Sequence, residues 1–476
     1  MNLTRMSANP ADWSLTDQVG AMKTGTLTAV DLAEATLKRI EARQPVLNCF
    51  IRVDEEGTRA AAKAADARRE TGEPLGPLHG APLAHKDMYY RKGVPVTCGS
   101  EIRRAFVPDV TATVLEKLDA AGALHVGALN MSEFASGPTG HNEHWGTCRN
   151  PWNPAHITGG SSTGSGSSVG GRLVAGSLGS DTGGSIRLPA GICGVYGIKP
   201  TQGRVSRHGV MGLSFSLDNV GPLARTARDC ARILTAIAGP DPKDTTALPV
   251  PAEDYEADID AGVKGMTIAI PETFYFDDID PEVAKAIDAV IAAYESQGAN
   301  IVRVTLPHHD VIDGLGSIVS AAEQCTIHDH WQRTCPEKYA PLIRARMMAG
   351  YGVTAVEYLK AMHLRSRIAS DVAAAAFGGA QVMLAPTVRF PVPTLEEMDV
   401  KDSPNMPEAL GRVNHSTRPI NYLGFPGLSV PCGFTASGLP IGFQLIGPAF
   451  SERMLFRFAG AYEAAVGLPD ALPDLP

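Results

Sequence analysis

One segment, residues 159–197, limits what this chain can fold into more than any other part of the sequence. It contains 13 glycines and eight serines, a content that by itself is typical of a flexible linker. A linker would not also carry apolar side chains at core-like intervals. This segment does, at Val169, Leu173, Val174, Leu178, Ile186, Leu188, Ile192 and Val195. The pattern therefore predicts a folded, buried segment on which the function of the chain depends.

Short motifs within this segment give two weaker interpretations. The segment has no G-x-x-x-x-G-K-[ST] pattern, and its G-x-G at 164–166 lacks the third glycine of a dinucleotide loop, so neither phosphate-binding loop is predicted. Residues 160–164 and 166–170 both fit G-x-S-x-G. In an α/β-hydrolase, that motif follows directly on a strand. The residues before it, 153–158, are turn-like, so an esterase of this type is an alternative only.

The rest of the chain alternates strand and helix patterns. Strands are expected within 76–87 and at 124–129, 266–270 and 382–386, helices at 113–122, 281–297 and 451–466, and a hairpin at 427–447. This alternation predicts an α/β fold. We expect one domain over residues 1–476, with a mostly helical peripheral region at about 305–378. That region shapes the substrate pocket, but its sequence shows no recognisable charge cluster.

Composition excludes several classes of protein. The net charge of −9 argues against a nucleic-acid binder that works by bulk charge. No apolar run approaches the ~20 residues of a membrane span, and the first residues carry no secretory pattern. The eight cysteines are scattered without a C-x-x-C pair, which disfavours a zinc ribbon. We expect a cytoplasmic protein with free thiols and no bound metal.

Longer motifs carry a resemblance to a known family. The sequence reads GGSS at 159–162, DTGGSIRLPA at 181–190 and CGVYGIKPT at 193–201. In these motifs the chain resembles the amidase signature family. The likeness continues at 78–87, 130–135, 149–152, 216–222 and 424–447, so it spans nearly the whole chain. It implies a three-layer α/β/α fold around a central mixed sheet.

The resemblance also implies roles for three residues. Ser185 corresponds to the nucleophile, Lys86 to the base, and Ser161 to the bridging serine that follows a cis peptide bond in this family. The 24 positions between the two serines agree with the family pattern. A lysine acts as a base only when it is neutral, and burial in an apolar strand lowers its pKa. The neighbouring carboxylate, Asp87, should face away because adjacent strand residues point to opposite sides.

Further residues follow from the same resemblance. Backbone N–H groups of Thr182, Gly183, Gly184 and Ser185 are expected to form the oxyanion hole, which the two glycines allow without Cβ clashes. Asp181 and Arg187 are expected to orient this loop by ion pairing. Ala135, Ser136 and Gly137 align with the segment that lines the acyl site of the family, and their small side chains leave room for a substrate.

These observations predict an amidase that hydrolyses the C–N bond of a small carboxylic amide, aryl amide or carbamate through an acyl-enzyme. No cofactor is implied, the partner is a small-molecule amide, and the resemblance makes a homodimer a reasonable expectation. One alternative shares the same triad, a glutaminase of the glutamyl-tRNA(Gln) amidotransferase A type that supplies ammonia to a partner. A non-catalytic binding protein is disfavoured because Lys86, Ser161 and Ser185 are all present.

Overall fold

A single mixed sheet organises the molecule. The computed structural model describes residues 7, 9–400, 403, 405–467 and 471–475. Within them, eleven strands pair in the order β1-β3-β2-β4-β6-β5-β10-β11-β9-β7-β8. The strands are β1 (Phe50–Val53), β2 (Pro82–Lys86), β3 (Leu124–Leu129), β4 (Gly176–Asp181), β5 (Tyr196–Lys199), β6 (Asn219–Ala224), β7 (Thr267–Pro271), β8 (Asn300–Val304), β9 (Val382–Pro386), β10 (Gly427–Phe434) and β11 (Pro440–Ile446).

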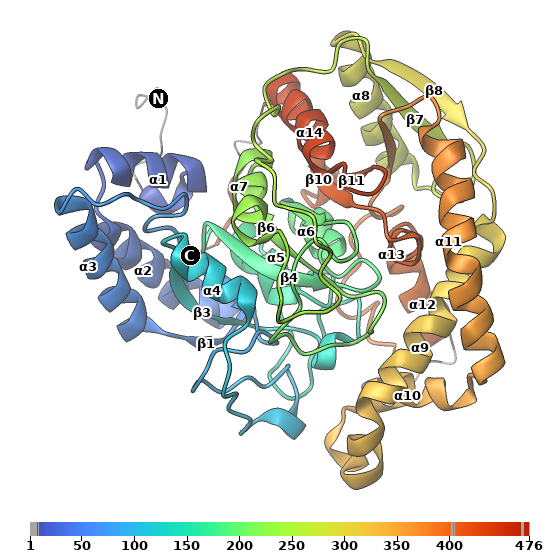
Figure 1. The fold of residues 1–476 in the computed structure, drawn as a ribbon, viewed down its shortest axis with the longest axis horizontal. Coiled ribbons are helices and arrows are strands. Elements are labelled where there is room, and N and C mark those ends of the chain that lie inside the picture. Colours follow the sequence, from blue (N-terminus) through green and yellow to red (C-terminus); the bar gives the residue numbers. More distant parts are fainter. Residues whose placement is uncertain (1–6, 8, 401–402, 404, 468–470, 476) are drawn as a thin grey trace.

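Helices cover both faces of this sheet (Figure 1). They are α1 (Leu15–Thr24), α2 (Ala29–Leu47), α3 (Glu55–Glu70), α4 (Thr113–Ala120), α5 (Thr163–Gly170), α6 (Arg187–Cys193), α7 (Ala227–Ile237), α8 (Pro281–Ser296), α9 (His309–Thr334), α10 (Pro341–Met348), α11 (Ala355–Phe377), α12 (Met406–Val413), α13 (Arg418–Leu423) and α14 (Glu452–Val466). The pair α7 and α14 packs on the central strands, and so does the pair α5 and α6. The two pairs lie on opposite faces, so the expected three-layer α/β/α architecture with a mixed sheet is confirmed.

Most elements expected from the sequence lie where the patterns placed them. The expected strands 124–129 and 382–386 are β3 and β9 with the same bounds. The expected hairpin is the antiparallel pair β10 and β11. The region 305–378 consists mainly of α9, α10 and α11, and α9 packs along α11 away from the N-terminal helices (Figure 1).

Strand β2 places the expected base on an interior strand, the third of the eleven in the sheet. All five of its residues are buried, and it pairs in parallel with β3 on one side and β4 on the other. A strand covered on both edges and both faces reads as an apolar run, which the sequence PLAHK follows for its first three residues before the buried His85 and Lys86. The strand therefore carries one lysine to its carboxyl end, inside the protein.

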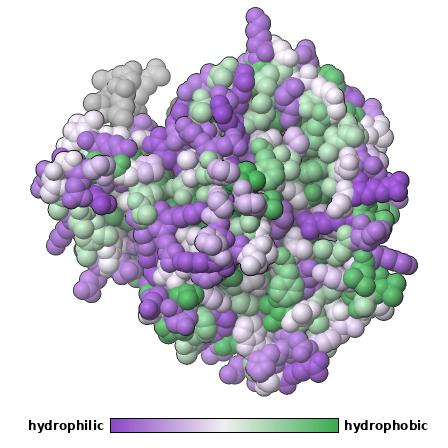
Figure 2. All heavy atoms as spheres, in the orientation of Figure 1, coloured by the Kyte–Doolittle hydropathy of each residue, from purple (hydrophilic) through white to green (hydrophobic). Residues whose placement is uncertain are grey.

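The surface shows no separation of hydrophilic from hydrophobic residues on the face that Figure 2 draws. Hydrophilic and hydrophobic residues are interspersed on the face shown in Figure 2, with hydrophilic residues prominent over the N-terminal helices. None of the helices in the described part of the chain combines the length and apolar character that crossing a bilayer requires. The eight cysteines are free thiols, and six of them are buried.

Candidate active site

The site begins with a buried lysine between two serine hydroxyls. Lys86 Nζ lies 2.7 Å from Ser161 Oγ and 2.9 Å from Ser180 Oγ. Ser161 stands just before α5, and Ser180 belongs to β4, which pairs with β2. Lys86 and Ser161 are fully buried, and Ser180 is only 3% exposed. The lysine is thus fixed in place by hydroxyl groups, with no water-exposed surface.

Burial tunes the pKa of this lysine. Desolvation lowers the pKa of Lys86 from 10.5 to about 7, while the more distant carboxylates of Asp218 and Asp181 act in the opposite direction. Asp87 does not neutralise the lysine, since its carboxylate accepts hydrogen bonds from the backbone N–H and the hydroxyl of Thr97. Lys86 is therefore substantially neutral near pH 7 and can accept a proton.

The turn that carries Ser161 and the loop that carries Ser185 are joined by a backbone hydrogen bond. The Gly160–Ser161 peptide bond is cis, as the resemblance implies. A Cβ atom on Gly160 would lie 2.3 Å from the carbonyl oxygen of Gly137, so only glycine fits at this position. The backbone N–H of Ser162 donates to the carbonyl of Ser185 at 3.3 Å, which ties the Ser185 loop to the Ser161 turn.

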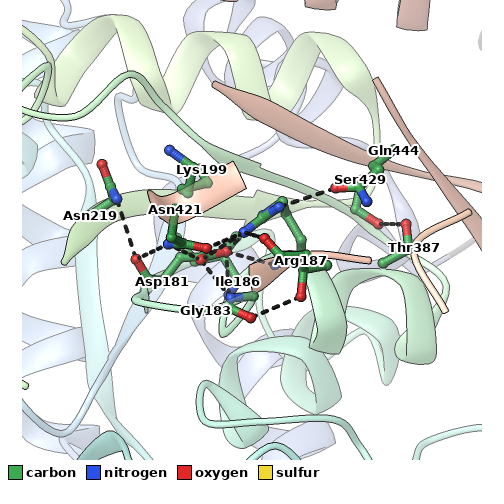
Figure 3. A network of polar contacts seen from close by, with 12 residues as sticks. Asp181, Gly183, Ile186, Arg187, Lys199, Asn219, Thr387, Asn421, Ser429 and Gln444 are labelled. Carbon is green, nitrogen blue, oxygen red and sulfur yellow. Dashed lines mark hydrogen bonds and ion pairs between the residues drawn. The ribbon is translucent and has the colours of Figure 1, made fainter. Parts of the chain in front are cut away.

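A buried ion pair holds the Ser185 loop, as Figure 3 shows. Arg187 Nε lies 3.0 Å from Asp181 Oδ2, and both side chains are fully buried. Burial alone would raise the pKa of Asp181, but Arg187 lowers it to about 2. Arg187 also donates to Asn421 Oδ1 and Gln444 Oε1, and Asn421 donates back to Asp181. The pair fixes both ends of the loop and connects it to the C-terminal hairpin.

The carboxylate of Asp181 also accepts a hydrogen bond from one amide of the expected oxyanion hole. The Gly184 N–H donates to Asp181 Oδ1 at 2.8 Å, so it does not point freely at a substrate. Thr182, Gly183 and Ser185 line the adjacent cavity. Of the four amides expected to form the hole, the one of Gly184 is thus engaged within the turn, and the other three belong to residues that line the cavity.

Ser185 faces a cavity of about 470 Å³. The three residues expected at the acyl site, Ala135, Ser136 and Gly137, line this cavity. So do side chains from α9, α10, α12 and α13. The structure thus brings the expected nucleophile, the expected acyl-site segment and the helical peripheral region to one space, while Lys86 and Ser161 lie behind its wall.

The family model for Amidase matches residues 31–456, the greater part of the chain. The chain belongs to the amidase family. Its curated relatives include the A component of the glutamyl-tRNA(Gln) amidotransferase of Roseiflexus sp. (strain RS-1), 39% identical over 97% of this chain and 98% of that protein.

Two solved structures share the fold of this chain over nearly its whole length. One, described as part of a vestigial protein complex that reveals the origins of an s-triazine catabolic enzyme, is 32% identical. Its TM-score is 0.89, over 96% of this chain and 99% of its own. The other is native peptide amidase from Stenotrophomonas maltophilia, 29% identical with a TM-score of 0.83, over 95% and 97% of the two chains. The chain is thus a member of a family of hydrolases acting on C–N bonds.

The amidase structure removes the esterase alternative. The central serines of the two G-x-S-x-G matches are Ser162 and Ser168, and both are fully buried. Ser162 donates to the carbonyl of Ser180, and Ser168 donates to that of Ser165. Neither lines the cavity that Ser185 faces, so neither hydroxyl is placed to attack a substrate.

Sequence reasoning missed three polar residues of this amidase site. Ser180 is a second hydroxyl on Lys86, and alternation along β4 could have placed it beside β2. Arg346 from α10 and Arg418 from α13 both line the cavity. They lie far apart in sequence, at 346 and 418, so no local pattern marks them as neighbours. In the described residues, no group of three or more His, Cys, Asp or Glu side chains is arranged to hold a metal ion.

Proposed function

We propose that this protein hydrolyses the C–N bond of a small carboxylic amide, with Ser185 as nucleophile, Ser161 as proton relay and Lys86 as base. One observation carries the proposal: the 2.7 Å contact between Ser161 and Lys86, where burial lowers the pKa of the lysine to about 7. A buried lysine made neutral by desolvation is a proton acceptor rather than a structural cation.

Acylation transfers one proton along this chain of groups. Ser185 Oγ attacks the amide carbonyl while its proton passes to Ser161, and the Ser161 proton passes to Lys86 Nζ. The carbonyl oxygen takes the negative charge beside the backbone N–H groups of Thr182, Gly183 and Ser185. The C–N bond then breaks as the nitrogen receives a proton back through Ser161, so an amine leaves and the acyl group stays on Ser185.

Deacylation repeats the sequence with water. Water adds to the acyl carbon and gives its proton through Ser161 to Lys86. The bond to Ser185 then breaks, and the proton returns to the Ser185 oxygen. The sum is one amide and one water converted to one carboxylic acid and one amine. The proton that Ser185 gives up leaves on the amine and one from water replaces it, so each residue regains its starting protonation state and the cycle requires no other reactant.

A second candidate function is that of a glutaminase supplying ammonia to a partner protein. The relatives favour it, because curated proteins named as the A component of glutamyl-tRNA(Gln) amidotransferase match nearly the full chain at 38–40% identity. That function uses the same acyl-enzyme chemistry on glutamine. The two candidates differ in the substrate and in whether activity requires a partner.

Covalent labelling tests the proposed chemistry. The protein is treated with a fluorophosphonate, and the adduct is located by intact-mass measurement and peptide mapping. One adduct on Ser185 is expected, with labelling lost in Lys86→Ala and retained in Ser168→Ala, the matched change of a buried serine outside the cavity. An adduct on another serine, or labelling unaffected by Lys86→Ala, contradicts the proposal.

A further inference from the structure

The wall of the cavity that faces the substrate carries two cations. Arg346 on α10 and Arg418 at the start of α13 both line it. None of the described residues that line this cavity is an aspartate or a glutamate. The wall is therefore positively charged, although the chain as a whole is acidic, with a net charge of −9.

Arg346 lacks an anionic partner. Its Nε donates to Ser136 Oγ at 3.1 Å, and Ser136 in turn donates to Gln324 Oε1. Among the residues that the structure describes, no carboxylate forms an ion pair with this guanidinium. Burial and the nearby Arg418 lower its pKa to about 10, which still leaves it charged at pH 7. A half-buried cation without a counter-charge is costly unless a ligand supplies one.

Arg418 lies beside the Ser185 loop and is paired with a carboxylate. Its Nη1 lies 3.0 Å from both carboxylate oxygens of Asp313 on α9, and its Nη2 donates to Asn414 Oδ1. A Cβ on Gly183 would lie 3.6 Å from Arg418 Cγ, so the stem of Arg418 runs beside the loop that holds Ser185. Asp313 balances the charge of Arg418, and one positive charge is left uncompensated at Arg346.

We propose that the acyl part of the substrate carries a carboxylate, which Arg346 and Arg418 bind, and that it carries no ammonium group. Guanidinium groups pair strongly with carboxylates through charge-assisted hydrogen bonds. A site that binds the substrate carboxylate in this way selects monoamides of dicarboxylic acids over neutral amides. The inference rests on the proposed function, since it names the substrate class of that site.

The polar groups of the wall also argue against an amino-acid amide. The α-ammonium of glutamine would need a counter-charge, and the nearby acceptors are the uncharged amide oxygens of Gln324 and Asn414, which already accept one hydrogen bond each from Ser136 and Arg418. An ammonium beside two guanidinium groups, with no lining carboxylate among the described residues, is repelled. Specificity of this kind comes from a repulsive element as much as from an attractive one.

Three amides of one chain length separate the possibilities. Glutaramate has the carboxylate and no amine, glutamine has both, and pentanamide has neither. We expect kcat/KM for glutaramate to exceed that of the other two by about 10- to 100-fold, the range of a hydrogen bond to a charged group. Arg346→Met and Arg418→Met should each remove most of this preference. The matched control is Arg344→Met, an exposed arginine on the same helix as Arg346, which should leave it unchanged.

A binding measurement covers the case in which a variant does not fold. In the unmodified protein, glutarate should inhibit at concentrations about tenfold or more below those of pentanoate, which lacks the second carboxylate. Equal inhibition, or pentanamide hydrolysed as well as glutaramate, overturns the inference while Ser185 labelling upholds the proposed function. Preference for glutamine overturns it in favour of the glutaminase candidate. Absence of any Ser185 adduct overturns the proposed function and this inference with it.

Discussion

Lys86 Nζ lies 2.7 Å from Ser161 Oγ, although the two residues are 75 positions apart in the chain. The lysine ends a buried strand that is paired on both sides, and the serine precedes a helix that packs on that strand. Both side chains are fully buried. The contact therefore depends on the tertiary fold, and its strength as a proton path depends on the protonation state of Lys86.

The activity should rise with pH through about 7. Burial lowers the pKa of Lys86 to about 7, and only the neutral amine accepts the proton from Ser161. Below this pH the lysine is an ammonium, so kcat/KM should fall about tenfold for each unit of pH. The measurement is kcat/KM from pH 5 to 9 with a neutral amide, whose own charge does not change over this range.

A second buried lysine provides the control for this profile. Burial also lowers the pKa of Lys199 to about 7, but its Nζ donates to the carbonyl of Pro200 and is outside the cavity lining. The fall of kcat/KM below about pH 7, the acidic limb of the profile, should persist in Lys199→Met. If the limb disappears in that variant, or if activity is highest at acidic pH, Lys86 is not the group that titrates.

Ser180 should tune the base without carrying the proton. It accepts a hydrogen bond from Lys86 at 2.9 Å, which favours the charged form of the lysine. Ser180→Ala should therefore move the acidic limb to lower pH and reduce kcat by about tenfold through looser positioning. Ser161→Ala breaks the path itself and should cost about 10²- to 10⁴-fold. Equal losses in the two variants, with no shift of the limb, would refute this division of roles.

The sequence predicted the catalytic segments better than the walls of the pocket. Lys86, Ser161 and Ser185 lie in dense local motifs, and burial of the strand explains why the pKa of Lys86 is lowered. The loop amides were predicted as a group of four, but the Gly184 N–H is taken by Asp181. A carboxylate three residues away that turns back on the loop leaves no signal in a linear pattern.

The arginines of the cavity could not be found in the same way. Arg346 and Arg418 come from helices that are separated in sequence by α11, β9 and α12, and they become neighbours only when α9, α10 and α13 pack together. Amphipathic patterns predict that a helix forms and which face it buries. They do not say which charged side chain at its edge will face a cavity.

Breaking the buried ion pair should destabilise the fold. Arg187→Met leaves the Asp181 carboxylate buried without its partner, so we expect a loss of about 3–5 kcal/mol in the free energy of unfolding. The double variant Asp181→Asn/Arg187→Met should lose less than the sum of the single losses. Urea titrations of the three variants test this. Additive losses would mean that the two side chains stabilise the loop independently.

The same pair predicts a pH dependence of stability. The folded-state pKa of Asp181 is about 2, below its ordinary 3.8, so its contribution is present above pH ~4 and is lost as pH falls towards 2. In the unmodified protein, the free energy of unfolding should fall over this window. Asp181→Asn should fall less steeply, and an identical slope in both proteins would contradict the assignment.

Two adjacent glycines of the Ser185 loop should respond differently to alanine. Gly184 has a φ of +124°, and a Cβ there would lie 2.1 Å from Thr417 Oγ1, which itself donates to the carbonyl of Gly183 at 2.8 Å. Gly184→Ala must therefore displace Thr417 and twist the loop. We expect a loss of about 1–3 kcal/mol in stability and of about 100-fold or more in kcat.

Gly183 provides the matched control. The nearest atom to a Cβ on Gly183 is 3.6 Å away, an ordinary contact, so Gly183→Ala should keep its stability within about 0.5 kcal/mol. Thermal unfolding of both variants, with kcat for Gly184→Ala, measures the difference. If both are equally stable, the close approach of Thr417 does not constrain this turn.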